Sequence, residues 1–347
     1  MHPRAQRPQL KRGPLGVRPL KGSVSSEWEA VGMRVAILDD IHRAYEGTTG
    51  VRRIREAAEV RIFTGPFGEP TALRGFDALV ANRERTRFTR ALLEKLPDLR
   101  IIAQTGNHAY HIDLAAAAEC GVIVAKAASG FSRGAGELAI GLAIALMRQI
   151  PAADSAVKRG QWRTPLTNVL HAKTLGILGL GHVGRHVAKI ATAFEMRVLA
   201  WSPRLTEEAA LAVGAERCEL DDLLRESDVV SIHLTLAPES LGLLSAQRIG
   251  LMKPTAYLIN TARGPIVDEA ALVAALVEGR IAGAGLDVFN DEPLPADHPL
   301  TRLSNVVLTP HLGWPTDEAY AHFADAAADV LLAYRDGREV PRFVEGH

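Results

Sequence analysis

The stretch that decides the fold runs Thr174-Leu175-Gly176-Ile177-Leu178 and continues Gly179-Leu180-Gly181-His182-Val183-Gly184. Its first five residues suit a buried strand, and residues 185–194 after the glycines suit a helix. A glycine-rich turn between a strand and a helix begins a βαβ unit. The stretch therefore predicts an open parallel sheet with helices on its faces.

The spacing of the glycines in this turn indicates a dinucleotide-binding loop. Gly179 permits the tight turn, Gly181 lets the backbone approach a pyrophosphate, and Gly184 lets the helix pack close to the strand. The phosphate oxygens would meet N–H groups at the start of the helix, beside His182 and Val183. A glycine turn without a ligand is the weaker interpretation, because a strand and a helix flank the turn on the required sides.

The end of the next strand bears on the choice between NAD and NADP. NAD-preferring loops usually carry Asp or Glu there to hold the ribose 2′-hydroxyl. In this sequence Ser202 stands at that position and lacks the carboxylate, while Arg204 could pair with a 2′-phosphate. The cofactor is therefore predicted as NAD(P), with NADP slightly favoured.

Two series of β-rich segments extend outward from this motif and alternate with helical segments. The first comprises residues 34–38, 60–63, 78–81, 101–104 and 122–125, and the second comprises residues 174–178, 197–201, 229–234, 256–260, 282–288 and 306–309. The alternation is typical of parallel α/β sheets. We expect two Rossmann-like or flavodoxin-like lobes with a cleft between them.

The boundaries of these lobes follow from the segments between them. We expect residues 33–128 and 317–347 to form a discontinuous substrate domain, and residues 129–316 to form the dinucleotide-binding domain. An apolar helix at 136–150, closed by Pro151, or an Ala-rich helix at 317–334 could bridge the lobes. Residues 1–32 are basic before Glu27 and lack an apolar segment, which favours a disordered extension over a secretory signal or a transit peptide.

Composition limits the class of partner. The 347 residues include 40 Lys plus Arg and 40 Asp plus Glu, so no net charge attracts nucleic acid or a membrane. Cys120 and Cys218 are the only cysteines, and no Cys/His cluster has metal-ligand spacing. The most apolar stretch, 138–147, is shorter than the roughly 20 residues that span a bilayer. We expect a cytoplasmic protein that binds a small molecule and no metal.

Three ionisable residues follow the nucleotide loop in order: Arg263, Glu292 and His311. A guanidinium can hold a carboxylate, an imidazolium can donate a proton, and a carboxylate can keep the imidazole charged. Together they are the minimum set for reducing the carbonyl of a 2-keto acid.

With these motifs the chain resembles the D-isomer-specific 2-hydroxyacid dehydrogenase family over residues 33–334. The shared motifs are 179–184, 233–239, 260–268, 283–293 and 309–313. The resemblance implies that Arg263 binds the substrate carboxylate and carbonyl, that His311 is the acid/base, and that Glu292 is its partner carboxylate. Seen alone, Glu292 could cap a turn and His311 could be a surface residue.

The resemblance also implies contacts with the cofactor. Asp287 would hydrogen-bond the nicotinamide carboxamide, Thr261 and Ala262 would line the same pocket, and the motif at His233 would adjoin the cofactor. Alone, Asp287 could also cap a turn.

In the first lobe the resemblance assigns Arg83, Glu84 and Gly106 to loops that meet the substrate; a solvated loop is the alternative. Residues 107–111 depart from the commonest family pattern. We interpret His108, His111 and His182 as loop or pocket-rim residues, because no carboxylate cluster stands at ligand spacing.

The implied reaction is hydride transfer between NAD(P)H and a small 2-keto acid to give a D-2-hydroxy acid, with glyoxylate or hydroxypyruvate favoured. A 3-phosphoglycerate dehydrogenase is an alternative, although many carry an additional C-terminal domain and this sequence ends soon after Tyr334. Formate dehydrogenases carry Gln where Glu292 stands, which argues against that chemistry. The alternative from another class is an NAD(H)-binding sensor similar to transcriptional corepressors.

Family members are usually dimers held through the nucleotide lobe, so a homodimer is expected. The apolar helix at 136–150 is the expected interface element. The alternative is that this helix is buried within its own chain.

Overall fold

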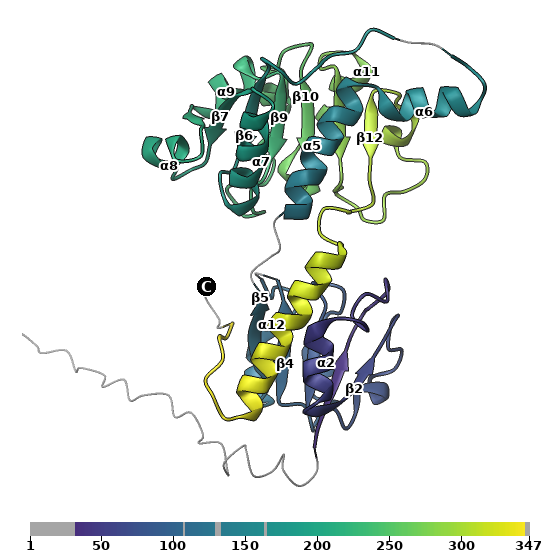
Figure 1. Cartoon of the computed structure of the whole chain (residues 1–347), viewed down its shortest axis with the longest axis vertical. Helices are drawn as coiled ribbons and strands as arrows, with labels where there is room; N and C mark the ends of the chain where they lie inside the picture. Colours follow the sequence, from purple (N-terminus) through teal and green to yellow (C-terminus); the bar gives the residue numbers. More distant parts are fainter. Residues whose placement is uncertain (1–31, 107, 129–132, 163–164, 344–347) are drawn as a thin grey trace, which may run out of the picture. The chain divides into compact units, whose positions relative to one another are not determined.

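The computed structural model describes residues 32–106, 108–128, 133–162 and 165–343. The chain forms two compact units (Figure 1): unit 1 comprises Met1–Gly130 and Tyr320–His347, and unit 2 comprises Phe131–Ala319. Helix α12 (Asp317–Arg335) contains the second boundary between them. The extension predicted at residues 1–32 lies, except for Gly32, outside the described residues.

Unit 1 is built on a five-stranded parallel sheet with the order β2-β1-β3-β4-β5. Its strands are β1 (Met33–Ile37), β2 (Ala58–Ile62), β3 (Ala78–Ala81), β4 (Ile101–Thr105) and β5 (Ile123–Ala128). Its shorter helices are α2 (Thr49–Arg55), η1 (Pro70–Leu73), α3 (Arg90–Leu93) and α4 (Leu114–Glu119). Helix α2 packs tightly on α12, since a Cβ on Gly50 would lie 2.1 Å from the carbonyl carbon of Ala324.

Unit 2 is built on a seven-stranded parallel sheet with the order β12-β11-β10-β9-β6-β7-β8. Its strands are β6 (Thr174–Leu178), β7 (Arg197–Trp201), β8 (Glu216–Arg217), β9 (Val229–Ile232), β10 (Tyr257–Asn260), β11 (Gly283–Leu286) and β12 (Val306–Leu308). Its helices are α5 (Arg133–Met147), α6 (Ile150–Lys158), α7 (His182–Ala193), α8 (Glu207–Leu211), α9 (Leu220–Glu226), α10 (Ala246–Ile249), η2 (Gly264–Ile266), α11 (Glu269–Val277) and η3 (Pro299–Arg302). The strand order reverses between β6 and β9, which is the switch point where doubly wound sheets bind dinucleotides.

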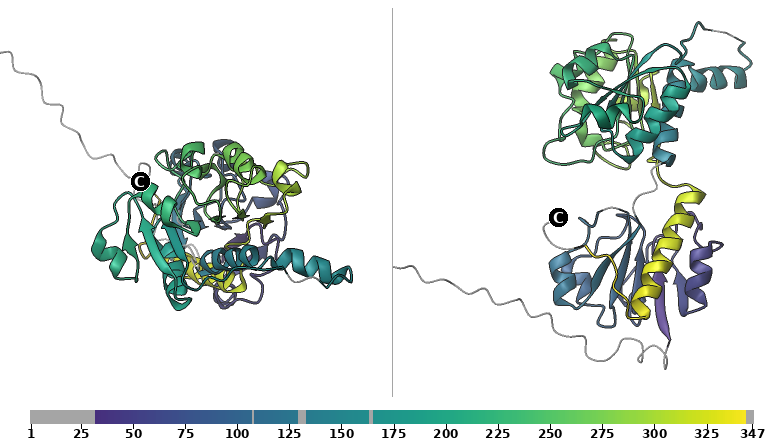
Figure 2. Two further views of the ribbon diagram at one scale, coloured as in Figure 1. Left: turned by 90° about the horizontal axis from the view of Figure 1, so that it is seen from above. Right: turned by 60° about the vertical axis from the view of Figure 1, so that its left-hand side comes forward.

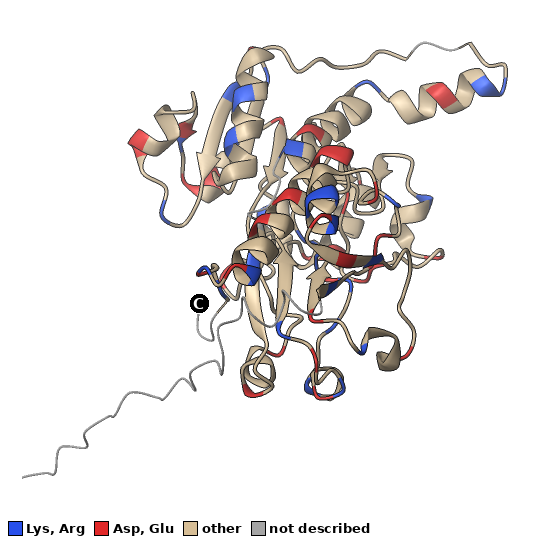
Figure 3. Ribbon diagram, turned by 60° about the horizontal axis from the view of Figure 1, so that its bottom comes forward, with Lys and Arg blue, Asp and Glu red and all other residues tan. Residues whose placement is uncertain are grey.

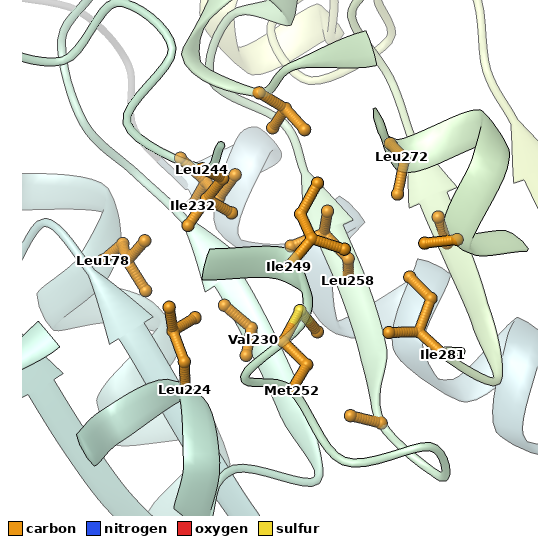
Figure 4. Packing of buried hydrophobic residues seen from close by; sticks show 14 of the residues in the cluster. Leu178, Leu224, Val230, Ile232, Leu244, Ile249, Met252, Leu258, Leu272 and Ile281 are labelled. Atoms are coloured by element: carbon orange, nitrogen blue, oxygen red, sulfur yellow. The ribbon is translucent and has the colours of Figure 1, made fainter. Parts of the chain in front are cut away.

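Burial of aliphatic side chains holds each sheet to its helices. Figure 4 shows Val230, Ile232 and Leu258 from the unit 2 sheet packing with Leu224, Ile249 and Leu272. All of these side chains are at most 2% exposed, and each contributes roughly 1.5 to 3 kcal/mol through its removal from water. The prediction of an α/β protein with two parallel sheets is confirmed.

The prediction that Pro151 closes the apolar helix is wrong. Helix α5 ends at Met147, Gln149 takes a left-handed backbone with φ 51°, and Pro151 lies in the first turn of α6. Proline suits that turn because its missing N–H would have no partner there and its φ already fits a helix. Helix α6 extends away from the sheet of unit 2 (Figures 1 and 2), and none of its residues is buried.

Charged residues of both signs are interspersed over the described elements (Figure 3), as expected from the balanced composition. Within the described ranges no single helix is long and apolar enough to cross a membrane, although the bent pair α5 and α6 passes the same test of length and composition.

Candidate active site

The glycine loop of unit 2 has the geometry of a phosphate cradle. Gly179 has φ 101°, and a Cβ there would lie 2.6 Å from the carbonyl oxygen of His233. A Cβ on Gly184 would lie 2.1 Å from the carbonyl oxygen of Gly179, so only glycine lets α7 begin this close to β6. Gly181 stands at the N-cap of α7 with open space at its Cβ position and without a side-chain cap. The loop therefore fits a pyrophosphate in the space that a larger residue at 181 would fill.

The residues around the loop lie where the sequence pattern predicts. His182 and Val183 form the first turn of α7, and His182 is exposed. Ser202 follows β7 and its Oγ accepts a hydrogen bond of 2.8 Å from the N–H of Leu180 in the loop. Arg204 is exposed two residues further on.

The segment after β10 presents Arg263. Asn260, at the end of the strand, is buried; its amide donates to the carbonyl of Arg263 at 2.9 Å and its oxygen accepts from the N–H of Ala262 at 3.0 Å. Gly264 follows, and a Cβ there would lie 2.1 Å from the carbonyl carbon of Phe289. The loop after β10 thus packs backbone to backbone on the loop that carries Glu292.

His311 and Glu292 are in direct contact, at 2.7 Å between Nδ1 and Oε2. Burial raises the pKa of Glu292, but the hydrogen bond with His311, the N–H of Phe289 and the charges of His311 and Arg263 outweigh it and hold this pKa below its ordinary value. Glu292 is therefore an ionised acceptor at neutral pH, and His311 Nδ1 is the donor. Nε2 remains the ring nitrogen with which His311 can give or take a proton.

Asp287 holds the turn that carries His311. Its buried carboxylate accepts hydrogen bonds from Thr309 Oγ1 at 2.6 Å, the N–H of Leu312 at 2.6 Å and the N–H of Gly313 at 2.9 Å. Its carbonyl accepts from the N–H of His311 at 3.0 Å. Burial raises the pKa of Asp287, although these donors and the charge of His311 oppose the rise. The predicted nicotinamide contact of Asp287 stays a prediction beside this internal use of its carboxylate.

The other predicted cofactor residues lie at neighbouring strand ends. His233 follows β9, its Nε2 is 2.8 Å from Ser231 Oγ, and burial lowers its pKa to about 3, so its ring is neutral at pH 7. Thr261 is directly after β10, with its Oγ1 3.5 Å from the carbonyl of Ala135 in α5. Ala262 packs against the apolar cluster beneath the sheet.

The predicted residues of unit 1 lie at the carboxyl ends of β3 and β4. Arg83 has φ 59°, its N–H donates to Thr105 Oγ1 at 3.0 Å, and its Nε is 3.6 Å from Glu84 Oε2. Gly106 has φ 110°, and a Cβ there would lie 3.1 Å from Nη1 of Arg83.

Sequence reasoning missed two histidine contacts here. His108 Nε2 lies 2.9 Å from Glu84 Oε1, and His111 Nε2 lies 3.1 Å from Gln104 Oε1. Gln104 donates its amide to backbone carbonyls, so His111 must donate to its oxygen. Burial, with lesser effects from Glu84, His108 and Arg83, lowers the pKa of His111 to about 4. Only the fold brings these groups together. Among the described residues no group of three His, Cys, Asp or Glu is placed to hold a metal.

Comparison with known proteins shows the family to which the chain belongs. A family model described as D-isomer specific 2-hydroxyacid dehydrogenase, NAD binding domain, matches residues 140–313. The sequence is 41% identical to glyoxylate reductase of Thermofilum pendens over 308 residues, which are 85% of this chain and 91% of that enzyme. It is 37% identical to D-3-phosphoglycerate dehydrogenase of Methanocaldococcus jannaschii over 292 residues, which are 83% of this chain and 54% of that enzyme. The chain thus spans about half the length of this second relative.

Similarity extends to solved structures. The apo-structure of D-lactate dehydrogenase from Escherichia coli matches with a TM-score of 0.80 at 26% identity, covering 89% of this chain and 99% of that one. The chain belongs to the D-isomer specific 2-hydroxyacid dehydrogenase family. The predictions of this family, of an NAD(P)-dependent oxidoreductase and of NAD(P) as cofactor are confirmed.

Proposed function

We propose that this protein reduces a small 2-keto acid of the glyoxylate or hydroxypyruvate type to the D-2-hydroxy acid. The observation that carries the proposal is the 2.7 Å contact of His311 with an ionised Glu292. Arg263 lies in the loop that packs against the loop of Glu292. Unit 2 would be the dinucleotide-binding domain, and Arg83, Glu84 and Gly106 of unit 1 would contact the substrate. The 91% coverage of a glyoxylate reductase supports this choice of substrate.

The catalytic residues divide the work of carbonyl reduction. Bound NAD(P)H supplies the hydride that reaches C2 of the substrate. Arg263 holds the substrate carboxylate through its planar fork of donors. His311, protonated on Nε2, gives that proton to the developing oxyanion, while Glu292 accepts from Nδ1 and stabilises the imidazolium. In the reverse direction, neutral His311 takes the hydroxyl proton.

Cofactor preference follows from the end of β7. Ser202 presents no carboxylate to a 2′-phosphate, and the exposed Arg204 is a cation within the same loop. We therefore expect NADPH to be accepted, and to be somewhat preferred over NADH.

A second candidate substrate is the phosphorylated acid of a 3-phosphoglycerate dehydrogenase. The 37% identity to such an enzyme over 83% of this chain favours it, although the match covers only 54% of that enzyme.

Initial rates at 340 nm test the proposal. Glyoxylate, hydroxypyruvate, pyruvate, phenylpyruvate and the 3-phosphorylated 2-keto acid would be supplied with NADH and NADPH in parallel. We expect turnover of glyoxylate or hydroxypyruvate, abolished in His311→Ala. Tight cofactor binding without turnover of any acid would instead indicate a sensor.

We also propose a homodimer. Helix α5, the expected interface element, is buried against its own sheet at Ala139, Leu142 and Leu146. The described part of residues 150–169 instead leaves large apolar side chains in solvent, among them Trp162 at 87% and Leu166 at 99% exposed. A cavity of about 270 Å³ lies where α6 begins and is lined in part by Gln149, Tyr257 and Val307. It could receive such a side chain from a second copy of the chain.

Light scattering after size exclusion tests this arrangement. The wild type should elute with twice the chain mass, and Trp162→Ala with Leu166→Ser should shift it toward the monomer while keeping the fold by circular dichroism. A monomeric wild type at micromolar concentration would refute the dimer. A double variant that stays dimeric would place the interface elsewhere.

A further inference from the structure

A second group of an arginine, a glutamate and a histidine lies in unit 1, apart from the proposed catalytic residues. Glu84 joins its members: Oε2 is 3.6 Å from Arg83 Nε, and Oε1 is 2.9 Å from His108 Nε2. The side chains of Arg83, Glu84 and His108 are 13%, 23% and 28% exposed. Solvent therefore screens their charges less than it screens those of surface ion pairs. We refer to these three residues as the Arg83–Glu84–His108 cluster.

The position of Arg83 in this cluster is held by the backbone. Thr105 Oγ1 accepts from its N–H at 3.0 Å, and Gln104 Nε2 donates to its carbonyl at 3.2 Å. The guanidinium lies over Gly106, where an added Cβ would come within 3.1 Å of Nη1. A left-handed backbone at a non-glycine residue persists only when its surroundings impose it. Arg83 is thus held beside Glu84 by contacts that do not involve a ligand.

The next arginine along the chain serves another part of unit 1. Arg85 Nη1 donates to the carbonyl of Asp39 at 2.8 Å, and its Nη2 is 3.4 Å from His42. Arg85 thus contacts Asp39 and His42, and Arg83 is the arginine paired with Glu84. Arg83 and Glu84 carry charges of opposite sign.

We propose that the Arg83–Glu84–His108 cluster selects 2-keto acids whose only charged group is the carboxylate next to the carbonyl. A second anion on the substrate, such as a phosphate or a further carboxylate, would gain from Arg83 but be repelled by Glu84. A hydroxyl group on the substrate is not repelled, because the carboxylate of Glu84 can accept its hydrogen bond. This inference rests on the proposed function, in which Arg83 and Glu84 contact the substrate. Within that function it favours the unphosphorylated substrates.

The test compares kcat/KM for hydroxypyruvate with that for its 3-phosphorylated form and for oxaloacetate, a 2-keto acid with a second carboxylate. The wild type should prefer hydroxypyruvate. In Glu84→Gln the ratio of anionic to neutral substrate should rise about tenfold, the size expected from removing one partly screened charge several ångströms away. Glu84→Asp keeps the charge and should keep a ratio near that of the wild type.

Glu94→Gln is the matched control, because it removes a charge from the same unit at the exposed pair with Arg90. Its ratio should equal that of the wild type. A wild type that prefers the phosphorylated acid overturns the inference, as does an unchanged ratio in Glu84→Gln when the wild type is active. Failure of the wild type to reduce any of these acids would overturn the proposed function itself, and the inference with it.

Discussion

The carboxyl edges of the two sheets each carry an arginine, a glutamate and a histidine, but the two groups are held differently. The histidine–glutamate distance is 2.7 Å at His311 in unit 2 and 2.9 Å at His108 in unit 1. The residue with a left-handed backbone is His311 in unit 2, with φ 57°, and Arg83 in unit 1, with φ 59°. A left-handed backbone is energetically unfavourable at a non-glycine residue and needs support from neighbouring hydrogen bonds. In unit 2 these hydrogen bonds support the histidine of the group, and in unit 1 they support the arginine. Unit 2 orients the proposed proton donor, and unit 1 orients a cation.

The groups that form these supporting hydrogen bonds also differ between the two units. A buried carboxylate, Asp287, gathers three donors around the turn of His311. In unit 1 an amide and a hydroxyl, from Gln104 and Thr105, hold Arg83. Asp287 thus fixes the backbone of the turn that carries His311, whereas neutral groups fix the backbone of Arg83 and leave its charge to be offset by Glu84. The role of a histidine–glutamate pair can therefore be inferred only together with the residues that hold it in place.

The largest effect should come from removing the histidine of unit 2. His311→Ala should lower kcat by about 10²- to 10⁴-fold, because the general acid is lost. His108→Ala should lower kcat no more than about tenfold, since His108 contacts Glu84 and is assigned no proton transfer. His171→Ala is the control, because His171 pairs with Glu195 at 3.0 Å on the surface. Steady-state rates with hydroxypyruvate would decide; losses of equal size at positions 311 and 108 would contradict the division between the units.

Two of the three glycines of the nucleotide loop should separate folding from binding. Gly184→Ala forces a Cβ to 2.1 Å from the carbonyl oxygen of Gly179, so α7 must shift and stability should fall by about 3 kcal/mol or more. Gly181→Ala meets nothing within 4 Å, and should weaken NADPH binding with little change in Tm. Thermal unfolding with cofactor fluorescence titration measures both. An unchanged affinity in Gly181→Ala would show that the loop does not approach the pyrophosphate.

Replacing the carboxylate in the His311 pair should produce an intermediate effect. Glu292→Gln should lower kcat by about 10- to 100-fold at pH 7, because the imidazolium loses its charged partner. The native pKa of Glu292 is below 4.5, so its stabilising contribution is present above pH 4.5 and disappears as the pH falls through the native value. The stability difference between wild type and variant, from urea unfolding, should therefore shrink from pH 7 to pH 3. A constant difference would contradict an ionic contact.

The smallest effect concerns the neutral buried histidines, one in each unit. The pKa of His111 is lowered from 6.5 to about 4, so the unfolded chain binds more protons between these values and stability falls as the pH drops through this range. In His111→Asn the loss of stability between pH 7 and pH 5 should be smaller by about 1 to 2 kcal/mol. His233 should leave a remaining slope, because its pKa is also lowered, to about 3. Urea midpoints at both pH values measure this; an unaltered slope would show that His111 is not buried neutral.

The strand pattern could be predicted from the sequence because each strand of a doubly buried parallel sheet is itself a short apolar run. The strands β6 and β7 have the predicted bounds, 174–178 and 197–201. Strand β8 was missed, since Glu216 and Arg217 are exposed and make only a two-residue edge. The break at Gln149 was missed as well, because an apolar run does not reveal a left-handed residue.

By itself the sequence determined the α/β class, the nucleotide loop and the three residues proposed for catalysis, because these depend on neighbours in the chain and on ordered motifs. Only the tertiary structure decided that Asp287 supports the turn of His311 and that Gly264 packs on Phe289. The same holds for the pairing of His108 with Glu84. The physical reason is that parallel strands bring their carboxyl ends to one edge, so the partners there come from loops far apart in sequence, and their hydrogen bonds depend on distances that no local pattern specifies.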